Sequence, residues 1–491
     1  MTTSFSSTPR RRRLVLVICC LSLFMVSLDT TILHIALPAL QQDLGASLSG
    51  LQWTIDAYTL VLASLLILAG SMADRFGRRR VFMAGLVVFT AGSALCSVAP
   101  SLETLVVFRM VQAVGGSMLN PVAMSIITHT FTDHSQRARA LGIWGSAVGL
   151  SMAAGPLLGG LLVDGAGWRS IFWLNLPVGL AALLLTQAFV PESRAEAARR
   201  PDPVGQVLII ALLAVLTSAV IQAPEHGWTS PTTVLMAGLA LAVAAVLVAY
   251  ELRRAEPLIE LRLFGSISFA GACLNALASF ATLGGFLFLT TLYLQNVRHL
   301  SAVHAGLWLL PMAVMTFLSA PVSGRLVARF GPRLPLLVAG CAITASGTLF
   351  AAFDGQTGTW SLVLGCALFG LGFGFVNAPV TTATVSAMPV SQAGVASSLA
   401  STFRQMGSAL GVAVIGAVLA SGIDAGAFAA TYTAAARPAW WIIAGCGLSV
   451  LIVGQLTTTR RTQGTARPAI EHTHLPRGVT DIPGRDPLTS R

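Results

Sequence analysis

The sequence reads GSMADRFGRRR at residues 70–80 and GRLVARFGPR at residues 324–333, two segments with the same glycine spacing. Each segment follows a long apolar stretch. A second pair of similar segments, NP at residues 120–121 and NAP at residues 377–379, is separated by nearly the same number of residues. Two matches at nearly one offset indicate an internal duplication.

The composition predicts that the surface of the protein faces hydrocarbon. Of 491 residues, 55% are apolar and 10% are charged, whereas soluble domains carry about a quarter charged residues. Fourteen apolar stretches of about 19 to 28 residues are each long enough to cross a bilayer as a helix. They are residues 14–37, 51–72, 81–99, 104–126, 140–163, 171–190, 204–223, 232–250, 267–291, 302–322, 334–353, 360–380, 394–421 and 438–457. We predict an all-α integral membrane protein.

The duplication divides these spans into two related halves. The first copies of the repeated segments belong to spans 2 and 4, and the second copies belong to spans 10 and 12. The repeated units are therefore spans 1–6 and spans 9–14. Spans 7 and 8 lie between the two units and are an insertion. We expect five parts: a cytoplasmic tail (1–13), a first six-helix bundle (14–190), linkers with the inserted pair (191–266), a second bundle (267–457) and a disordered cytoplasmic tail (458–491).

The basic residues, all of them arginine, orient the chain. Although the net charge of +11 invites a nucleic-acid function, most arginines fall in every other connection between spans. The opposite connections hold only Arg169, Arg298 and Arg437. Because positive charge gathers on the cytoplasmic side, we expect both termini in the cytoplasm and no nucleic-acid partner.

Motifs of an enzyme or a metal protein are missing from the sequence. The seven cysteines lie almost wholly inside spans and show neither a disulfide framework nor a metal-binding spacing. There is no phosphate-binding G-x-x-x-x-G-K-[ST] loop, paired metal motif or nucleophile elbow. We therefore expect no cofactor, no metal and no catalytic residue, and an intramembrane enzyme is the disfavoured alternative.

Three charged residues fall inside the spans of the first half. Asp29 lies about 22 Å along span 1 from its cytoplasmic end, and Asp56 and Arg109 lie about 8 Å from the outer ends of spans 2 and 4. Charged residues at such depth are functional candidates. An arginine near Asp29 would tune proton exchange, because burial and a neighbouring cation act in opposite directions on a carboxyl group. His34 is either a further relay residue or an ordinary interfacial histidine.

Polar residues recur at helical spacing on three spans and predict a central aqueous cavity. The seams are Arg109, Gln112, Gly116 and Asn120 on span 4; Gln52, Asp56 and Thr59 on span 2; and Asn377, Thr381 and Thr384 on span 12. The expected substrate-binding residues are Asp29, Asp56, Gln52, Gln112, Asn120, Asn377 and Thr381. The alternative is a buried polar network that only joins helices.

An ordered series of segments resembles the fourteen-span drug:proton antiporters of the EmrB/QacA type, within the major facilitator superfamily. The segments include LDTTILHIALP (28–38), the loop at 70–80, FRMVQAVGGS (108–117), SMAAGPLLGG (151–160), WRSIFWLNLPVG (168–179) and FRQMGSALGVAV (403–414). His34 replaces the usual asparagine. The resemblance covers about residues 14–457 and implies the major facilitator fold, with two six-helix bundles and two inserted helices.

The loop motif predicts a gate at the cytoplasmic mouth, formed by Gly70, Asp74, Arg75, Gly77 and Arg78. Gly77 permits a tight turn, and Asp74 can form ion pairs that break and reform as the bundles rock. The alternative is a topology signal alone, which explains the arginines but not Asp74. The second copy has Ala328 in place of the aspartate, so only the first copy can act in this way.

Small residues in span 5 predict close helix packing. Gly155, Gly159 and Gly160 allow helices to approach, and Pro156 removes one backbone hydrogen bond. The resemblance associates this segment with exchangers, whereas ordinary packing is the alternative. Arg404, inside span 13, pairs either with helix ends or with an anionic group of the substrate.

These observations predict a proton-coupled secondary active exporter in the bacterial inner membrane. Asp29, Asp56 and Arg109 would couple protons to the export of small lipophilic or cationic drugs by alternating access. We expect a monomer whose partners are protons, a small-molecule substrate and the lipid bilayer. Two alternatives remain open, a dedicated exporter of one endogenous metabolite, antibiotic or lipid, and an importer of the same fold.

Overall fold

The computed structural model describes residues 9–194, 202–254, 257–259, 261–353, 358–386 and 393–458, and their regular structure is helical throughout. The helices are α1 (Pro9–Leu44), α2 (Leu48–Phe76), α3 (Arg78–Ser97), α4 (Leu102–Thr130), α5 (His134–Ala166), α6 (Ser170–Trp173), α7 (Asn175–Phe189), α8 (Pro203–His226), α9 (Pro231–Arg253), α10 (Ile267–Leu292), α11 (Ala302–Phe330), α12 (Arg333–Ala351), α13 (Thr359–Ser386), α14 (Ala393–Gly422) and α15 (Phe428–Thr457). Short turns of other helix types are η1 (Leu261–Gly265), η2 (Tyr293–Val297) and η4 (Ala425–Ala427).

Local sequence sets many of the helix ends. The Ser101 side chain accepts a hydrogen bond from the backbone nitrogen of Thr104 at the start of α4, and the Thr104 side chain accepts one from the backbone nitrogen of Ser101. Pro203 occupies the first turn of α8, directly after the capping Asp202. At the end of α2, Gly77 has a φ of 112°, which side-chain-bearing residues rarely adopt.

Fourteen described segments are long and apolar enough to cross a membrane. The predicted number of spans is thus confirmed. Several helices extend beyond the predicted apolar stretches, as α1 does at both of its ends. The sixth span is made of two consecutive helices, α6 and α7, which are separated at Leu174, although the backbone angles of Leu174 are themselves helical.

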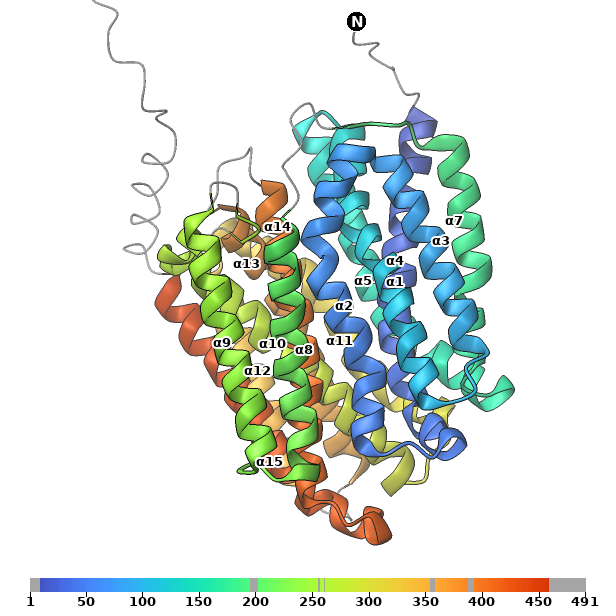
Figure 1. Cartoon of the computed structure of the whole chain (residues 1–491), viewed down its shortest axis with the longest axis vertical. Helices are drawn as coiled ribbons and strands as arrows, with labels where there is room; N and C mark the ends of the chain where they lie inside the picture. The colour runs from blue at the N-terminus through green and yellow to red at the C-terminus, as the bar shows by residue number, and fades with distance from the viewer. Residues whose placement is uncertain are drawn as a thin grey trace, which may run out of the picture.

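The helices pack in two sets that meet along two seams. In the first set, α1 packs on α5, and α4 packs on both α2 and α3; in the second, α10 packs on α14, α11 on α13 and α12 on α15. Figure 1 shows α3, α4 and α7 on one side of the molecule and α12 and α15 on the other. The seams between the sets are α2 against α14 and α5 against α11.

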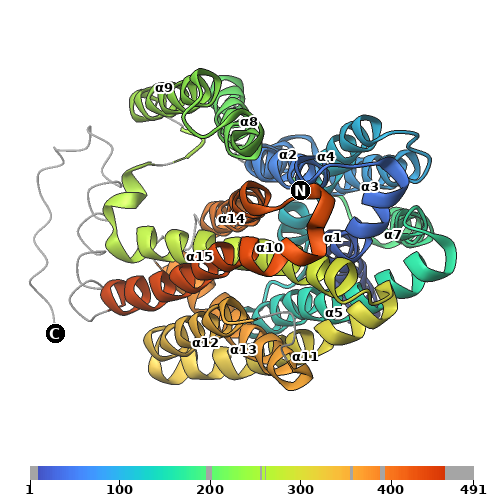
Figure 2. The same cartoon turned by 90° about the horizontal axis from the view of Figure 1, so that it is seen from below.

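The inserted helices α8 and α9 form a pair at the edge of the molecule (Figure 2). Helix α8 packs against both α2 and α14, so it covers one of the two seams. The Gln206 side chain of α8 donates a hydrogen bond to the Ser64 carbonyl of α2 at 2.6 Å. Helix α9 buries little of its surface, which suits a helix that faces hydrocarbon.

Hydrogen bonds between the two sets gather at the end of the molecule that the arginine pattern assigns to the outside. Asp164 accepts from the backbone nitrogens of Ala302 and Val303 at 3.1 and 3.0 Å. Gln295, in η2 directly after α10, donates to the Ile35 carbonyl at 2.9 Å. These contacts hold the outer ends of the two sets together.

Candidate substrate and proton site

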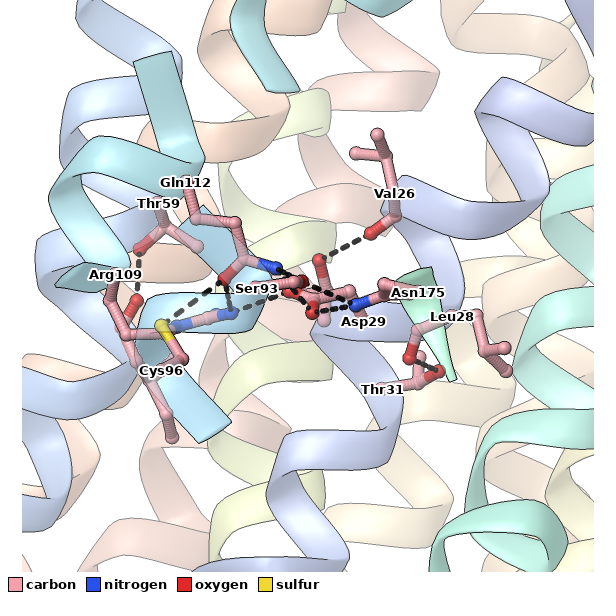
Figure 3. A network of polar contacts seen from close by, with 12 residues as sticks. Val26, Leu28, Asp29, Thr31, Thr59, Ser93, Cys96, Arg109, Gln112 and Asn175 are labelled. Atoms are coloured by element: carbon pink, nitrogen blue, oxygen red, sulfur yellow. Dashed lines mark hydrogen bonds and ion pairs between the residues drawn. The ribbon is translucent and has the colours of Figure 1, made fainter. Parts of the chain in front are cut away.

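A cluster of polar side chains surrounds Asp29, inside the first set of helices (Figure 3). The Asp29 side chain is 1% exposed. One carboxylate oxygen accepts a hydrogen bond from Arg109 at 2.5 Å, and the other accepts from Gln112 and Asn175, each at 2.8 Å. Four donor and acceptor groups from α1, α4 and α7 therefore meet at one point, although their positions in the sequence span nearly 150 residues.

Neighbouring groups extend the cluster to α3. The Ser93 hydroxyl accepts hydrogen bonds from Gln112 at 2.7 Å and from Asn175 at 3.0 Å. The side-chain oxygen of Gln112 in turn accepts from Arg109 at 2.7 Å. Each amide thus bridges Asp29 to a second partner, so the side chains hold one another in fixed orientations.

Arg109 is fully buried and lies against aromatic rings. Its guanidinium carbon is 4.1 Å from the centre of the Tyr58 ring and 5.8 Å from that of Phe172. Aromatic faces attract a cation, and this attraction adds to the ion pair with Asp29. A charge pair buried in this way depends on both partners, because removal of either leaves an uncompensated charge in a region of low dielectric constant.

The structure places Asp56 apart from this cluster, on the seam between α2 and α14. Its side chain is fully buried, and neither carboxylate oxygen has a hydrogen-bond partner among the described residues. One turn earlier, Gln52 donates to the carbonyls of Val412 and Ala413 on α14, at 3.1 and 2.8 Å. Gln52 therefore joins the two sets of helices.

The other predicted polar residues lie elsewhere along the interior. The side-chain oxygen of Asn120 is buried without a partner among the described residues. Asn377 is partly exposed, and Thr381, one turn later on α13, is exposed and accepts a hydrogen bond from Arg404 at 2.6 Å. His34 is buried at 2% exposure, five residues after Asp29. The structure thus brings Asp29, Arg109 and Gln112 together, with His34 near enough to Arg109 to be affected by its charge, and leaves the other candidates at separate points.

The loop motif at residues 70–80 makes its described contacts within the first set of helices. Asp74 accepts from Arg78 at 2.9 Å, one turn further along the chain. Glu192, just beyond α7, accepts from the backbone of Arg79 at 3.1 Å. A side chain at Gly77 would meet Glu192, since its Cβ would lie 2.6 Å from a carboxylate oxygen. Gly70 and the exposed Arg75 make no hydrogen bond, ion pair or ring contact with a described residue of the second set of helices.

The small residues of span 5 lie on two interfaces. Gly155 and Gly159 face Thr31 and Ile32 of α1, whereas Gly160 faces the start of α11. A Cβ at Gly160 would lie 2.6 Å from the Ala302 carbonyl oxygen. The carbonyl of Pro156 lies against Gly306. The motif therefore allows α5 to contact both its own set and the opposite one.

Sequence reasoning missed three residues that the structure places at these sites. Ser93 and Asn175 complete the cluster around Asp29, and Glu192 contacts the loop motif. The signal for Asn175 was its position as a polar residue in an apolar stretch of a segment already recognised by resemblance. Ser93 carried no comparable signal, because a small hydroxyl residue within a span is common in helix packing.

The family of the chain follows from comparison with known proteins. Residues 19–412 match the model of the Major Facilitator Superfamily. The chain belongs to this superfamily of membrane transporters, and its fold and fourteen spans agree with that assignment.

Two curated relatives are named for drug resistance or export. The chain is 38% identical to Multidrug resistance protein Stp of Mycobacterium tuberculosis, over 85% of this chain and 77% of that protein. It is 40% identical to the Tetracenomycin C resistance and export protein of Streptomyces glaucescens, over 81% and 74%. The resemblance to drug antiporters is thereby confirmed at the level of the family.

A solved structure shows the same fold. A bacterial homologue of the human lysosomal transporter Spinster has a TM-score of 0.62 and 17% identity, covering 96% of this chain and all of that one. The superfamily match and the relatives make the protein a multi-pass transporter of the bacterial inner membrane that acts on small molecules, and not an enzyme.

Proposed function

We propose that this protein is a proton-driven exporter of small drug-like molecules that works by alternating access between its two sets of helices. The relatives named for drug resistance support export. The cluster around Asp29 is the observation that carries proton coupling, because it places a buried carboxylate within reach of one cation and two amides.

Protonation of Asp29 would change this cluster in a defined way. A protonated carboxyl group has no charge to pair with Arg109 and must donate a hydrogen bond where the charged form only accepts. Gln112 and Asn175 both donate to one oxygen, which still accepts when the group is protonated, so the proton would sit on the other oxygen and face the guanidinium of Arg109. Since Asp29 is on α1 and Arg109 on α4, a proton at Asp29 would break the ion pair that joins these two helices.

The seam residues supply a second part of the mechanism. Gln52 joins α2 to α14 at the outer end, and Asp164 joins α5 to the start of α11. Opening to the outside requires both contacts to break. Asp56 lies one turn from Gln52 on this seam and is the proposed second proton-binding residue.

The energetics are adequate for export without nucleotide hydrolysis. A proton-motive force of about 180 mV corresponds to roughly 4 kcal/mol for each proton that enters. This energy supports about a thousandfold gradient of a neutral substrate exchanged for one proton.

Uphill transport in proteoliposomes tests the proposal. Vesicles with an acidic interior and a clamped membrane potential should accumulate rhodamine 123 while protons leave, and collapse of the pH gradient with nigericin should release the dye. Asp29→Asn should abolish accumulation. Asp424→Asn, which changes an exposed carboxylate that caps η4, should leave it unchanged. Accumulation that persists without a pH gradient would refute proton coupling.

The breadth of substrates distinguishes two versions of this function. A multidrug exporter is favoured by the relative named for multidrug resistance, and a dedicated exporter by the relative named for tetracenomycin C. A deletion strain tested against chemically unrelated antibiotics separates them. Sensitisation to several classes supports multidrug efflux, whereas sensitisation to one class supports a dedicated exporter.

A further inference from the structure

The second set of helices contains an arginine whose setting differs from that of Arg109. Arg404 lies on α14, about 8 Å inside the membrane-spanning segment that begins at Leu399. Its guanidinium donates to the Thr381 hydroxyl at 2.6 Å. Among the residues that the structure describes, none places a carboxylate within ion-pair distance of Arg404, and its Nε atom is buried without a hydrogen-bond partner.

An unpaired cation at this depth is costly unless it faces water or meets an anion. Arg404 is partly exposed, and its partner Thr381 is exposed. Parts of both side chains are therefore accessible from outside the helix packing. Because Thr381 is neutral, the charge of the guanidinium remains uncompensated by this contact.

An aromatic surface lies beside the cation. The guanidinium carbon is 5.8 Å from the centre of the Phe280 ring, and Phe280 is partly exposed. Phe280 also contacts Phe373 edge to face, with 5.1 Å between the two ring centres. Three helices, α10, α13 and α14, thus provide a cation, a hydroxyl and an aromatic face at one place.

We propose that Arg404, Thr381 and Phe280 form a subsite for the anionic oxygen of a substrate, a carboxylate or phenolate attached to an aromatic ring. The guanidinium pairs with the oxygen through two N–H groups, and the ring of the substrate lies on Phe280. This subsite rests on the proposed transport function and specifies its substrate class. It adds organic anions and zwitterions to the cationic drugs that Asp29 and Asp56 suggest.

A pair of dyes that differ by one charge tests the subsite. Rhodamine 110 carries a free carboxylate, and rhodamine 123 is its methyl ester. Binding to the purified protein in detergent, followed by fluorescence polarisation, requires no proton gradient, so failure here and failure of proton coupling are separate results. We expect the wild type to bind rhodamine 110, and Arg404→Gln to weaken that binding tenfold or more while changing rhodamine 123 binding less than threefold.

Matched variants complete the experiment. Arg404→Lys should retain part of the affinity for rhodamine 110, since it keeps the charge but loses the fork of donors. Thr381→Val should cause a selective loss of about threefold through the lost hydroxyl. Arg329→Gln removes the same charge at the cytoplasmic end of α11, where the arginine lies on Phe330, and should change neither affinity.

Three outcomes would overturn the subsite. The first is a wild type that does not bind rhodamine 110, and the second is an equal effect of Arg404→Gln on both dyes. The third is an unchanged ratio of the two dye affinities in Thr381→Val. This outcome decides the question if Arg404→Gln fails to elute as a folded monodisperse protein.

Discussion

Two arginines inside the membrane-spanning part, one in each set of helices, have opposite surroundings. Arg109 is 1% exposed and pairs with Asp29, with Tyr58 stacked against it. Arg404 is partly exposed, and its described polar contact is the neutral Thr381. The same residue type therefore has a fixed internal partner in one half and an accessible, uncompensated charge in the other.

This difference suggests different roles for the two sets of helices. In the proposed mechanism the closed network around Asp29 responds to protons, because a change of one charge rearranges the contacts of that carboxyl group. An open cation responds to ligands, because it gains a partner only when one arrives. We interpret the first half as the proton-responsive part and the second as a contributor to substrate choice.

The largest effect on stability is expected from the loss of the Arg109 side chain. Arg109→Gln leaves Asp29 buried without its cation and should destabilise the protein by roughly 3 to 5 kcal/mol. Arg404→Gln removes no internal ion pair and should change stability by less than about 1 kcal/mol. Thermal unfolding of the two purified variants, followed by intrinsic fluorescence, measures the difference. Equal losses would contradict the contrast between the two arginines.

The contact between the two sets is the next target. Gly160→Val places a side chain against the backbone of Ala302, and should prevent the outer ends from closing. We expect transport to fall at least tenfold, with normal insertion into the membrane. Gly165→Val, on the same helix but with open space around the glycine, is the matched control. Normal transport by Gly160→Val would show that this contact is dispensable.

A pair of asparagines sharpens the comparison between the halves. Asn175→Ala removes hydrogen bonds to Asp29 and Ser93, and should destabilise the protein by about 1 to 3 kcal/mol. Asn377→Ala, at a partly exposed position, should have an effect within about 0.5 kcal/mol. The same unfolding assay measures both. A larger loss of stability for Asn377→Ala than for Asn175→Ala would contradict the proposal that the first set has the more tightly bonded polar interior.

The smallest effect on stability is expected at the loop motif. Asp74→Asn removes the ion pair with Arg78, which is partly solvent-exposed and contributes little to folding. Substrate binding should persist, whereas transport should slow, because the gate hypothesis assigns Asp74 to the movement of the two sets. Initial rates in proteoliposomes measure this. An unchanged rate would reduce the motif to a topology signal.

Much of the fold could be predicted from the sequence, because a span leaves a long apolar run that needs no tertiary information. The break between α6 and α7 was not predicted, although Pro177 follows Leu174 by three residues and cannot donate the backbone hydrogen bond to Trp173 that a continuous helix needs. Helical spacing gave the face on which Gln52 lies but not its neighbour, and the structure places that neighbour on α14, 360 residues away. Long-range packing alone determines such a pairing.

The site was partly accessible to the same reasoning. Asp29 and Arg109 stood out, because charge is rare and expensive within a span. Their depths suggested proximity, which the ion pair bears out geometrically. Asn175 is a polar residue in an apolar stretch, which marks it as a candidate, but neither Asn175 nor Ser93 carries a local signal that places it beside Asp29.

Proton release on substrate binding tests the central claim most directly. Purified wild-type protein in weakly buffered detergent should release protons when rhodamine 123 is added. Asp29→Asn should bind the dye and release clearly fewer protons than the wild type, while Asp56→Asn, which leaves the Arg109 cluster intact, should keep most of the release. If Asp29→Asn releases protons as the wild type does and also transports the dye uphill at the wild-type rate, Asp29 is not the coupling site.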